Sequence, residues 1–301
     1  MKIEYLTVDV FTAERFGGNP LAVVPDGRGL TPKLMQQVAT EFNYSETTFV
    51  LPPDDPAHTA RVRIFTPRAE LPFAGHPNVG TAFVLAQQGE AFGCAVGGKL
   101  AFEEIAGLVQ VELVKDGAQV VGARIQAPEA FQKGADVPAG LVAESCSLAA
   151  ADVELANHAP CVATAGLPYV FAEISSQGAL GNAVPRYDAF ERHVPADMAA
   201  GICLYTHASE GDADIYARVF APLHGVTEDP ATGSANVALA GLLASIAPEP
   251  SLTFERTVAQ GAHMGRPSRL HIAAKKQGGV VTETRVGGRC VPVMAGTLGV
   301  D

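Results

Sequence analysis

Several features are scarce or missing in this 301-residue sequence, and each absence excludes a class of protein. No apolar run approaches the ~20 residues that a membrane-spanning helix needs. The N-terminus shows neither the apolar segment of a signal peptide nor an Arg-rich transit helix. The cysteines are odd in number and form no C-x-x-C pair: Cys94, Cys146, Cys161, Cys203 and Cys290. We therefore expect a cytoplasmic protein with reduced, structural thiols and no membrane partner.

Basic residues are also few, with 21 Lys and Arg against 32 Asp and Glu, a net charge of −11. Nucleic acids and anionic membranes bind basic surfaces, so neither is an expected partner. Hydrophobic residues at 48% and charged residues at 18% are typical of a globular chain. The length allows about two domains.

The common cofactor and metal motifs are missing as well. G-x-G-x-x-G, G-x-S-x-G and H-E-x-x-H do not occur, and the eight histidines show no ligand spacing. The segment GCAVGGKL (93–100) fits G-x-x-x-x-G-K, but Leu100 stands where a Ser or Thr must bind magnesium, and a strand follows it. We expect no cofactor and no metal.

A long-period repeat organises what is present. RIFTP (63–67) recurs as RVFAP (218–222), and ELPFAGHPNVGTA (70–82) recurs as EDPATGSANVALA (228–240). The blocks keep their order and direction, and only the linkers RA and LHGVT differ in length. A repeat of this period indicates duplicated domains. We place them at residues 1–131 and 132–301, with a last strand that can pack back on the first half.

Each half contains one helix that is small and apolar nearly all round, which predicts a helix buried inside its own domain. A helix opened by Thr31 and Pro32 shows a capped start. Strand patterns flank these helices, so we predict an α+β fold of two similar domains, each a set of strands around one apolar helix. His76 and Ser234 stand where an N-cap is expected, and Gly75 and Gly233 allow a tight turn.

The duplicated turn is the main candidate for chemistry. A helix N-terminus carries partial positive charge and unpaired N–H groups, so it can bind a carboxylate. Capping alone is the alternative reading for each turn, and a solvated surface carboxylate is the alternative reading for Glu46 in NYSETTFV.

Five segments together resemble the PhzF-like family of phenazine biosynthesis over nearly the whole chain. They are VDVFTAERFGGNPLAVV, NYSETTFV, RIFTPRAELPFAGHPNVGTA, EDPATGSAN and AQGAHMGRPSRL. The resemblance implies the diaminopimelate-epimerase-like fold, in which each of two similar domains is a β-barrel-like sheet around a central helix. It further implies an active site between the two domains, a cofactor-free enzyme and a homodimer. It also implies that Glu46 is the general acid/base, and that His76, Asp229 and Ser234 bind substrate and relay protons.

Related racemases and epimerases use one cysteine from each half at these turns, but neither turn of this chain contains cysteine. Two opposed thiols can invert a stereocentre, whereas a single carboxylate more naturally returns a proton elsewhere on the same face. We therefore predict an isomerase that moves a proton and a double bond in a small carboxylic acid. His76 and Asp229 would assist Glu46, while Ser234 and the N–H groups after Gly75 and Gly233 would bind the substrate. The alternatives are a cysteine-independent epimerase or racemase and a silent small-molecule binding protein.

Overall fold

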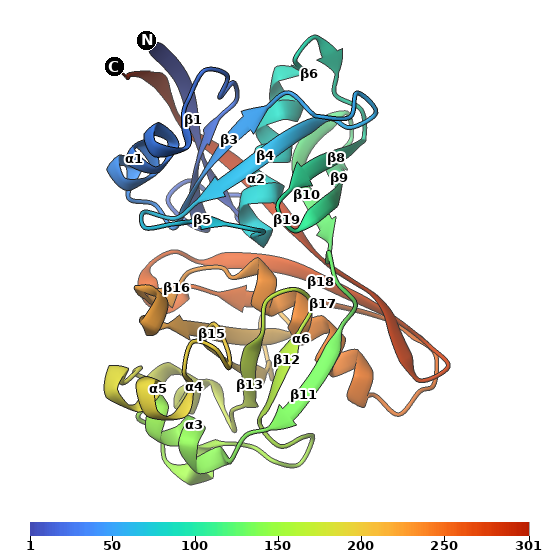
Figure 1. Ribbon diagram of the computed structural model, residues 1–301. Helices are drawn as coiled ribbons and strands as arrows, with labels where there is room; N and C mark the ends of the chain where they lie inside the picture. The colour runs from blue at the N-terminus through green and yellow to red at the C-terminus, as the bar shows by residue number, and fades with distance from the viewer. Residues whose placement is uncertain (301) are drawn as a thin grey trace. The chain divides into compact units, whose positions relative to one another are not determined.

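The protein divides into two compact units in a computed structural model that describes residues 1–300 (Figure 1). Unit 1 comprises Met1–Pro128 and the segment from Gly287 onward, and unit 2 comprises Glu129–Val286. From the sequence we placed one boundary after residue 131, directly before strand β11 (Gln132–Asp136), whereas the two units divide between Pro128 and Glu129. The return to unit 1 arises because one long strand, β19 (Val280–Gly299), serves both units in turn.

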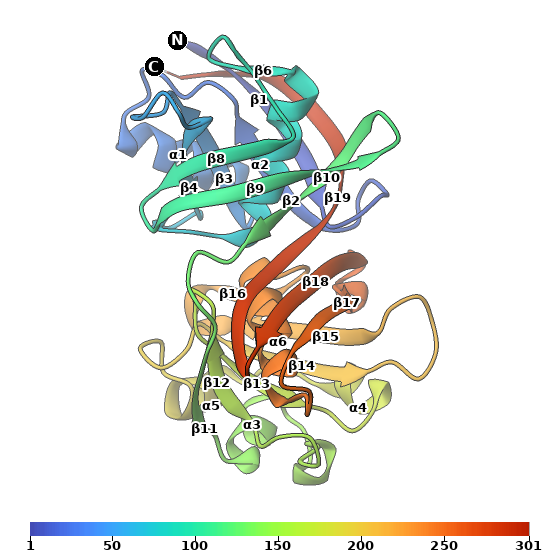
Figure 2. The same ribbon diagram turned by 90° about the vertical axis from the view of Figure 1, so that its right-hand side faces the viewer.

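Eight strands of unit 1 form a closed ring (Figure 2). In ring order they are β1 (Lys2–Val10), β2 (Asn19–Val24), β3 (Glu46–Leu51), β4 (Ala60–Phe65), β8 (Lys99–Glu104), β9 (Gly107–Asp116), β10 (Gln119–Gln126) and the end of β19. The ring closes where β1 and β19 pair antiparallel, from Lys2 with Gly299 to Val10 with Cys290. The pairs β2–β3 and β4–β8 are parallel. The first barrel therefore depends on residues from both ends of the chain.

Helix α2 (Gly75–Gln88) is the centre of this barrel and contacts β1, β2, β3, β9 and β10. Its first eleven residues, 75–85, are all buried, which the small apolar sequence predicted. The remaining elements of unit 1 lie around the barrel: helix α1 (Pro32–Phe42), strand β5 (Glu70–Leu71) and the hairpin of β6 (Glu90–Ala91) and β7 (Cys94–Ala95). Helix α1 has the predicted cap, since the Thr31 hydroxyl accepts from the Leu34 N–H at 3.2 Å.

Unit 2 repeats this strand plan. Its order is β11, β12 (Cys161–Thr164), β13 (Tyr169–Glu173), β14 (Ile202–His207), β15 (Ile215–Ala221), β17 (Leu252–Gln260), β18 (Ser268–Gln277) and the start of β19. The parallel pairs are β13–β14 and β15–β17, which correspond to those of unit 1. Helix α6 (Gly233–Ile246) contacts β12, β17 and β18, and the short strand β16 (Val226–Asp229) leads into it.

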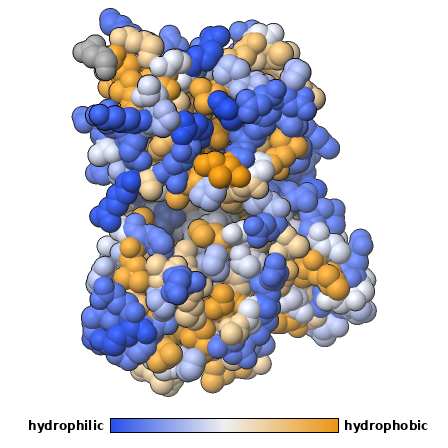
Figure 3. All heavy atoms as spheres, in the orientation of Figure 1, coloured by the Kyte–Doolittle hydropathy of each residue, from blue (hydrophilic) through white to orange (hydrophobic). Residues whose placement is uncertain are grey.

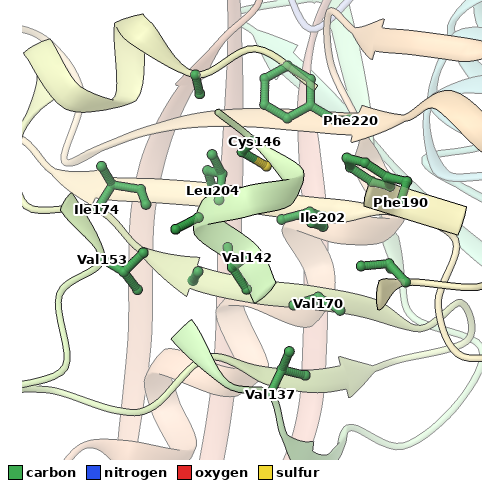
Figure 4. Close-up of a cluster of buried hydrophobic side chains, with 14 of the residues drawn as sticks. Val137, Val142, Cys146, Val153, Val170, Ile174, Phe190, Ile202, Leu204 and Phe220 are labelled. Atoms are coloured by element: carbon green, nitrogen blue, oxygen red, sulfur yellow. The ribbon is translucent and has the colours of Figure 1, made fainter. Parts of the chain in front are cut away.

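Unit 2 adds a second hydrophobic cluster around helices α3 (Ala139–Ser145), α4 (Gln177–Asn182) and α5 (Tyr187–His193). Figure 4 shows Val142 of α3, Cys146 just after that helix and Phe190 of α5 lying against strands of the sheet. The strand residues of the cluster are Val170, Ala172, Ile202, Leu204 and Phe220, and all are fully buried. Both faces of this sheet are therefore covered, one by α6 and the other by the three short helices.

The residues shared by the two sequence copies make the same contacts in both units. Arg63 binds Glu70 through two hydrogen bonds of 2.6 Å, and Arg218 binds Glu228 at 2.9 and 2.8 Å. The amides of the helix asparagines repeat as well: Asn78 donates to Ala74 O at 3.0 Å and Asn236 to Thr232 O at 2.9 Å. The residues shared by the two copies therefore form the turn, and the residues that differ between the copies are the candidates for a functional role.

The predicted α+β fold of two similar domains, each a barrel-like sheet around a central helix, is confirmed. On the face drawn in Figure 3, apolar residues are interspersed with hydrophilic ones. Within residues 1–300, every helix is too short or too polar to cross a membrane.

Candidate active site

Glu46 is the first residue of strand β3, which pairs parallel with β2 at Leu21. Side chains two apart on a strand share a face, so Glu46 and Thr48 point the same way. The Thr48 hydroxyl lies 2.8 Å from that of Thr81 on the central helix, in the buried interior of the barrel. This contact fixes β3 against α2 and turns Glu46 toward the start of that helix.

His76, the second residue of α2, meets Glu46 there. Its Nε2 lies 3.4 Å from Glu46 Oε2, and the two side chains are 5% and 16% exposed. The solvated alternative for Glu46 is therefore wrong, because the carboxylate is nearly enclosed. Two of the residues singled out from sequence form one pair in unit 1.

The electrostatics of the pair determine which proton His76 carries. Burial lowers the pKa of His76 to about 3, although its hydrogen bond to the Pro20 backbone works in the opposite direction. The imidazole is therefore neutral near pH 7. Nε2 makes no hydrogen bond, so the ring donates to the Pro20 carbonyl through Nδ1. The unprotonated Nε2 then faces the Glu46 carboxyl as a hydrogen-bond acceptor.

The predicted capping roles of His76 and Ser234 are wrong. Helix α2 begins at Gly75 with Ala74 as its N-cap, and α6 begins at Gly233 with Thr232 as its N-cap. Neither helix has a side-chain cap hydrogen bond, because Ala74 has no polar side chain and the Thr232 hydroxyl donates to Asp229. His76 and Ser234 are the second residues of their helices. Gly75 and Gly233 have helical backbone, so the turn does not need a left-handed glycine. The uncapped N–H groups suit an anionic ligand.

The corresponding turn of unit 2 carries Asp229 and Ser234. Asp229 ends strand β16, and its Oδ2 accepts a hydrogen bond of 2.6 Å from the Thr232 hydroxyl. Ser234 Oγ lies 3.0 Å from the hydroxyl of Tyr169, a buried residue that begins β13. Asp229 and Ser234 are both half-buried. This turn offers a carboxylate, hydroxyl groups and a helix N-terminus, which together can bind a polar acid.

A buried glutamine that sequence reasoning left without a role organises this turn. Gln260 accepts from Asn236 Nδ2 at 2.8 Å, and its own amide donates to Asp229 O at 2.8 Å and to Thr232 Oγ1 at 3.1 Å. Nearby, the Ser268 hydroxyl donates to Pro230 O at 2.9 Å. Both residues lie in the segment AQGAHMGRPSRL, so their signal was that segment's resemblance to the family, while Tyr169 had no sequence signal.

The two turns, within the described residues 1–300, contain no cysteine and no set of side chains that could hold a metal ion. Four of the five cysteines are buried, and only Cys94 is exposed. Burial raises the pKa of Cys146 to about 12 and also raises those of Cys203 and Cys290. No three or more His, Cys, Asp or Glu side chains within residues 1–300 are arranged to hold a metal ion. The reactive groups at the turns are therefore carboxylates, imidazole and hydroxyls.

Comparison with known proteins gives consistent matches along the chain. The family model described as phenazine biosynthesis-like protein matches residues 8–296. An uncharacterised isomerase of Mesorhizobium japonicum is 39% identical over 300 residues, 98% of each chain. The trans-2,3-dihydro-3-hydroxyanthranilate isomerase of Pseudomonas aeruginosa is 34% identical over 94% of this chain and 95% of its own.

A solved structure shares the whole fold. The PhzF-family phenazine biosynthesis protein of Bacillus anthracis superposes with a TM-score of 0.87 at 22% identity, and 100% of each chain is covered. The expected diaminopimelate-epimerase-like fold is therefore confirmed.

Proposed function

Since this chain belongs to the phenazine biosynthesis-like protein family and is an isomerase like its relatives, we propose that it moves a proton and a double bond in a small carboxylic acid, with Glu46 as the acid/base. The observation that carries this proposal is the enclosed Glu46–His76 pair, with 3.4 Å between the facing atoms. An enclosed carboxylate can take a proton from carbon without competition from bulk water.

The proposed reaction is a balanced proton transfer. Glu46 removes a proton from an acidic C–H bond, and the electron pair of that bond shifts to form an enol-like intermediate. The Glu46 carboxylic acid then returns the proton to a different carbon on the same face, so the double bond moves and no atom is gained or lost. No oxidant or reductant is needed.

His76 serves as the relay partner of Glu46 in this scheme. Its Nδ1 proton is engaged by the Pro20 carbonyl, while Nε2 is an acceptor that faces Glu46. A neutral imidazole in this tautomer stabilises Glu46 when the carboxyl carries the substrate proton. This favours the relay role over direct donation to a substrate oxygen.

The residues of unit 2 are assigned to the substrate carboxylate. Ser234 and the uncapped N–H groups after Gly233 would hold it, the N–H groups after Gly75 would stabilise the developing negative charge, and Asp229 would assist proton transfer. The acid that the Pseudomonas aeruginosa relative is named for, trans-2,3-dihydro-3-hydroxyanthranilate, is the first substrate to test. The homodimer and the cytoplasmic location stay predictions, and light scattering of the purified protein checks the first of them.

Deuterium incorporation from heavy water tests the proposal. A panel of small unsaturated, hydroxy and amino acids, including trans-2,3-dihydro-3-hydroxyanthranilate, is incubated with wild type, with Glu46→Gln and with Glu41→Gln, an exposed control on α1. We expect label and a shifted double bond with wild type and Glu41→Gln, and neither with Glu46→Gln, which still binds the acid.

Three results would contradict the proposal. Unchanged turnover by Glu46→Gln removes the acid/base role. Inversion of a stereocentre, with label on the opposite face, establishes the epimerase or racemase alternative. Equal binding by both proteins without exchange of any compound establishes a binding protein.

A further inference from the structure

Glu104 is a half-buried acid with buried carboxyl oxygens, and the proposed reaction does not use it. It ends strand β8, and both of its carboxyl oxygens are buried without a hydrogen-bond partner among residues 1–300. An ionised carboxylate in that position loses its hydration without compensation, which is costly. The ionised form of Glu104 is therefore disfavoured at this position.

The internal duplication identifies the counterpart of Glu104. Strand β4 pairs with β8 as β15 pairs with β17, and both pairs are parallel. The paired residues are Ala60–Phe102 and Arg61–Glu103 in unit 1, and Ile215–Val258 and Tyr216–Ala259 in unit 2. Because Arg63 corresponds to Arg218, the two registers align Glu103 with Ala259 and hence Glu104 with Gln260.

The surroundings of the two residues agree with this alignment. Gln260 accepts from Asn236 on α6, and the side chain of Asn78, which matches Asn236 on α2, lies beside Glu104. The carbonyl groups of the matching turn prolines also accept hydrogen bonds from residues that come shortly after Glu104 and Gln260 in the chain. Ala106 N–H donates to Pro72 O at 3.0 Å, and Ser268 Oγ donates to Pro230 O.

The side chain at the position shared by Gln260 and Glu104 needs one hydrogen-bond acceptor and one donor. Gln260 uses its oxygen to accept from Asn236 and its N–H groups to donate to Asp229 O and Thr232 Oγ1. A protonated carboxyl group has the same shape and likewise offers one acceptor and one donor, whereas an ionised carboxylate offers only acceptors. We propose that Glu104 is held as a neutral carboxylic acid and acts in unit 1 as Gln260 acts in unit 2, positioning the turn that leads to His76.

The charges around Glu104 are consistent with this protonation. Glu104 itself lines a pocket of about 500 Å³, together with Asp54, Asp55, His58, Glu103, Gly107 and Leu108. These charged groups engage one another, since Glu103 accepts from His58 and from the Asp54 and Asp55 N–H groups. Burial raises the pKa of Glu104 to about 8, and the Asn78 amide works weakly against it. Within residues 1–300, no cation contributes to the pKa of this carboxyl group.

Infrared spectroscopy of the ligand-free protein tests the protonation. The difference spectrum of wild type minus Glu104→Gln at pH 6.5 should contain the C=O stretching band of a carboxylic acid, which disappears as the pH passes about 8. Glu103→Gln is the matched control and should remove no such band, because its pKa is lowered to about 2 by the Asp54 and Asp55 N–H groups and His58 despite burial. A carboxylate band in place of the acid band for Glu104 overturns the proposal.

Activity tests the positioning role, and this part rests on the proposed function. The wild-type exchange rate should fall about tenfold per pH unit above about 8 if only the neutral acid supports the turn. Glu104→Gln should keep the rate at lower pH and lose the alkaline fall, while Glu104→Leu, which has neither donor nor acceptor, should lose activity at every pH. Equal losses in Glu104→Gln and Glu104→Leu would overturn the role. The infrared band is measured without substrate, so it stands or falls separately from the isomerase proposal.

Discussion

His76 Nε2 lies 3.4 Å from Glu46 Oε2, and the imidazole is neutral because burial lowers its pKa to about 3. An acceptor nitrogen therefore faces the carboxyl that is proposed to carry the substrate proton. Because the two ring nitrogens have different partners, substitutions of His76 can test the role of each nitrogen separately.

His76→Asn should lower the exchange rate by about 10²-fold or more. The asparagine amide can take the place of Nδ1 and still donate to the Pro20 carbonyl, but nothing replaces Nε2. His76→Gln places its amide nearer the position of Nε2 and should lose less. The rate of deuterium exchange into the substrate measures both, with exposed His263→Asn as the control. A wild-type rate in His76→Asn would remove His76 from the reaction.

The two Arg–Glu pairs should differ in their effect on stability. Arg218 has 9% of its side chain exposed and also donates to the carbonyls of Leu180, Gly181 and Ala183 at 3.1, 3.1 and 2.8 Å. Arg63 has 21% of its side chain exposed, and beyond Glu70 it contacts the sulfur of Met35 at 3.5 Å. Arg218→Met should therefore lower the free energy of unfolding by about 3–5 kcal/mol, and Arg63→Met by about 1–3 kcal/mol.

Urea denaturation measures both values at pH 7. If Arg63→Met costs as much as Arg218→Met, the carbonyl contacts of Arg218 contribute nothing and the comparison of the two turns is wrong.

Local signals explain how much of this fold the sequence predicted. The buried helices follow from their small apolar residues, the cap of α1 follows from Thr31 and Pro32, and the duplicated turn follows from direct repetition. For the last strand, the sequence indicated only that it can pack back on the first half; its pairing partner and register do not follow from sequence, because the pairing of Lys2 with Gly299 joins opposite ends of the chain. Long-range pairing of this kind leaves no local pattern.

The candidate site could be proposed from sequence to the extent that its residues belong to motifs. Glu46, His76, Asp229 and Ser234 lie in conspicuous segments, whereas Glu104 ends an ordinary strand and Tyr169 begins another. Their importance arises from burial and from side-chain partners across the fold. The misplaced caps have a similar cause, since the direction of the His76 side chain depends on Glu46 and Pro20 and not on its neighbours in sequence.

Gly80→Ala should destabilise unit 1 although alanine favours a helix. An added Cβ would lie 2.5 Å from Leu21 Cδ2 and 2.8 Å from Val10 Cγ2, inside the packed barrel. Overpacking costs about 1–3 kcal/mol, which exceeds the gain of about 1 kcal/mol in helix propensity. Gly98→Ala is the control, because its added Cβ has no atom within 4 Å. Thermal unfolding should show a lower midpoint for Gly80→Ala alone, and a rise would mean that the barrel has room for the methyl group.

The dependence of stability on pH should separate His76 from Glu104, since their pKa values move in ways that oppose each other. The folded pKa of His76 is lowered from 6.5 to about 3, so the unfolded chain binds more protons and stability is lost as the pH falls from 6.5. The folded pKa of Glu104 is raised from 4.5 to about 8, so the folded protein binds more protons and stability is lost as the pH rises from 4.5.

Between pH 4.5 and 6.5 the two effects should nearly cancel in the wild-type protein. In this range the unfolded chain carries a proton on His76 and none on Glu104, whereas the folded protein carries a proton on Glu104 and none on the His76 nitrogen that titrates. His76→Asn leaves only the Glu104 effect, so its free energy of unfolding should fall with rising pH by up to about 1.4 kcal/mol per unit. Glu104→Gln leaves only the His76 effect and should rise with pH by a similar amount. Urea titrations at half-unit intervals measure the three slopes. Parallel curves for all three proteins would mean that neither group keeps its buried, neutral form, whereas opposite slopes in the two variants identify both groups at once.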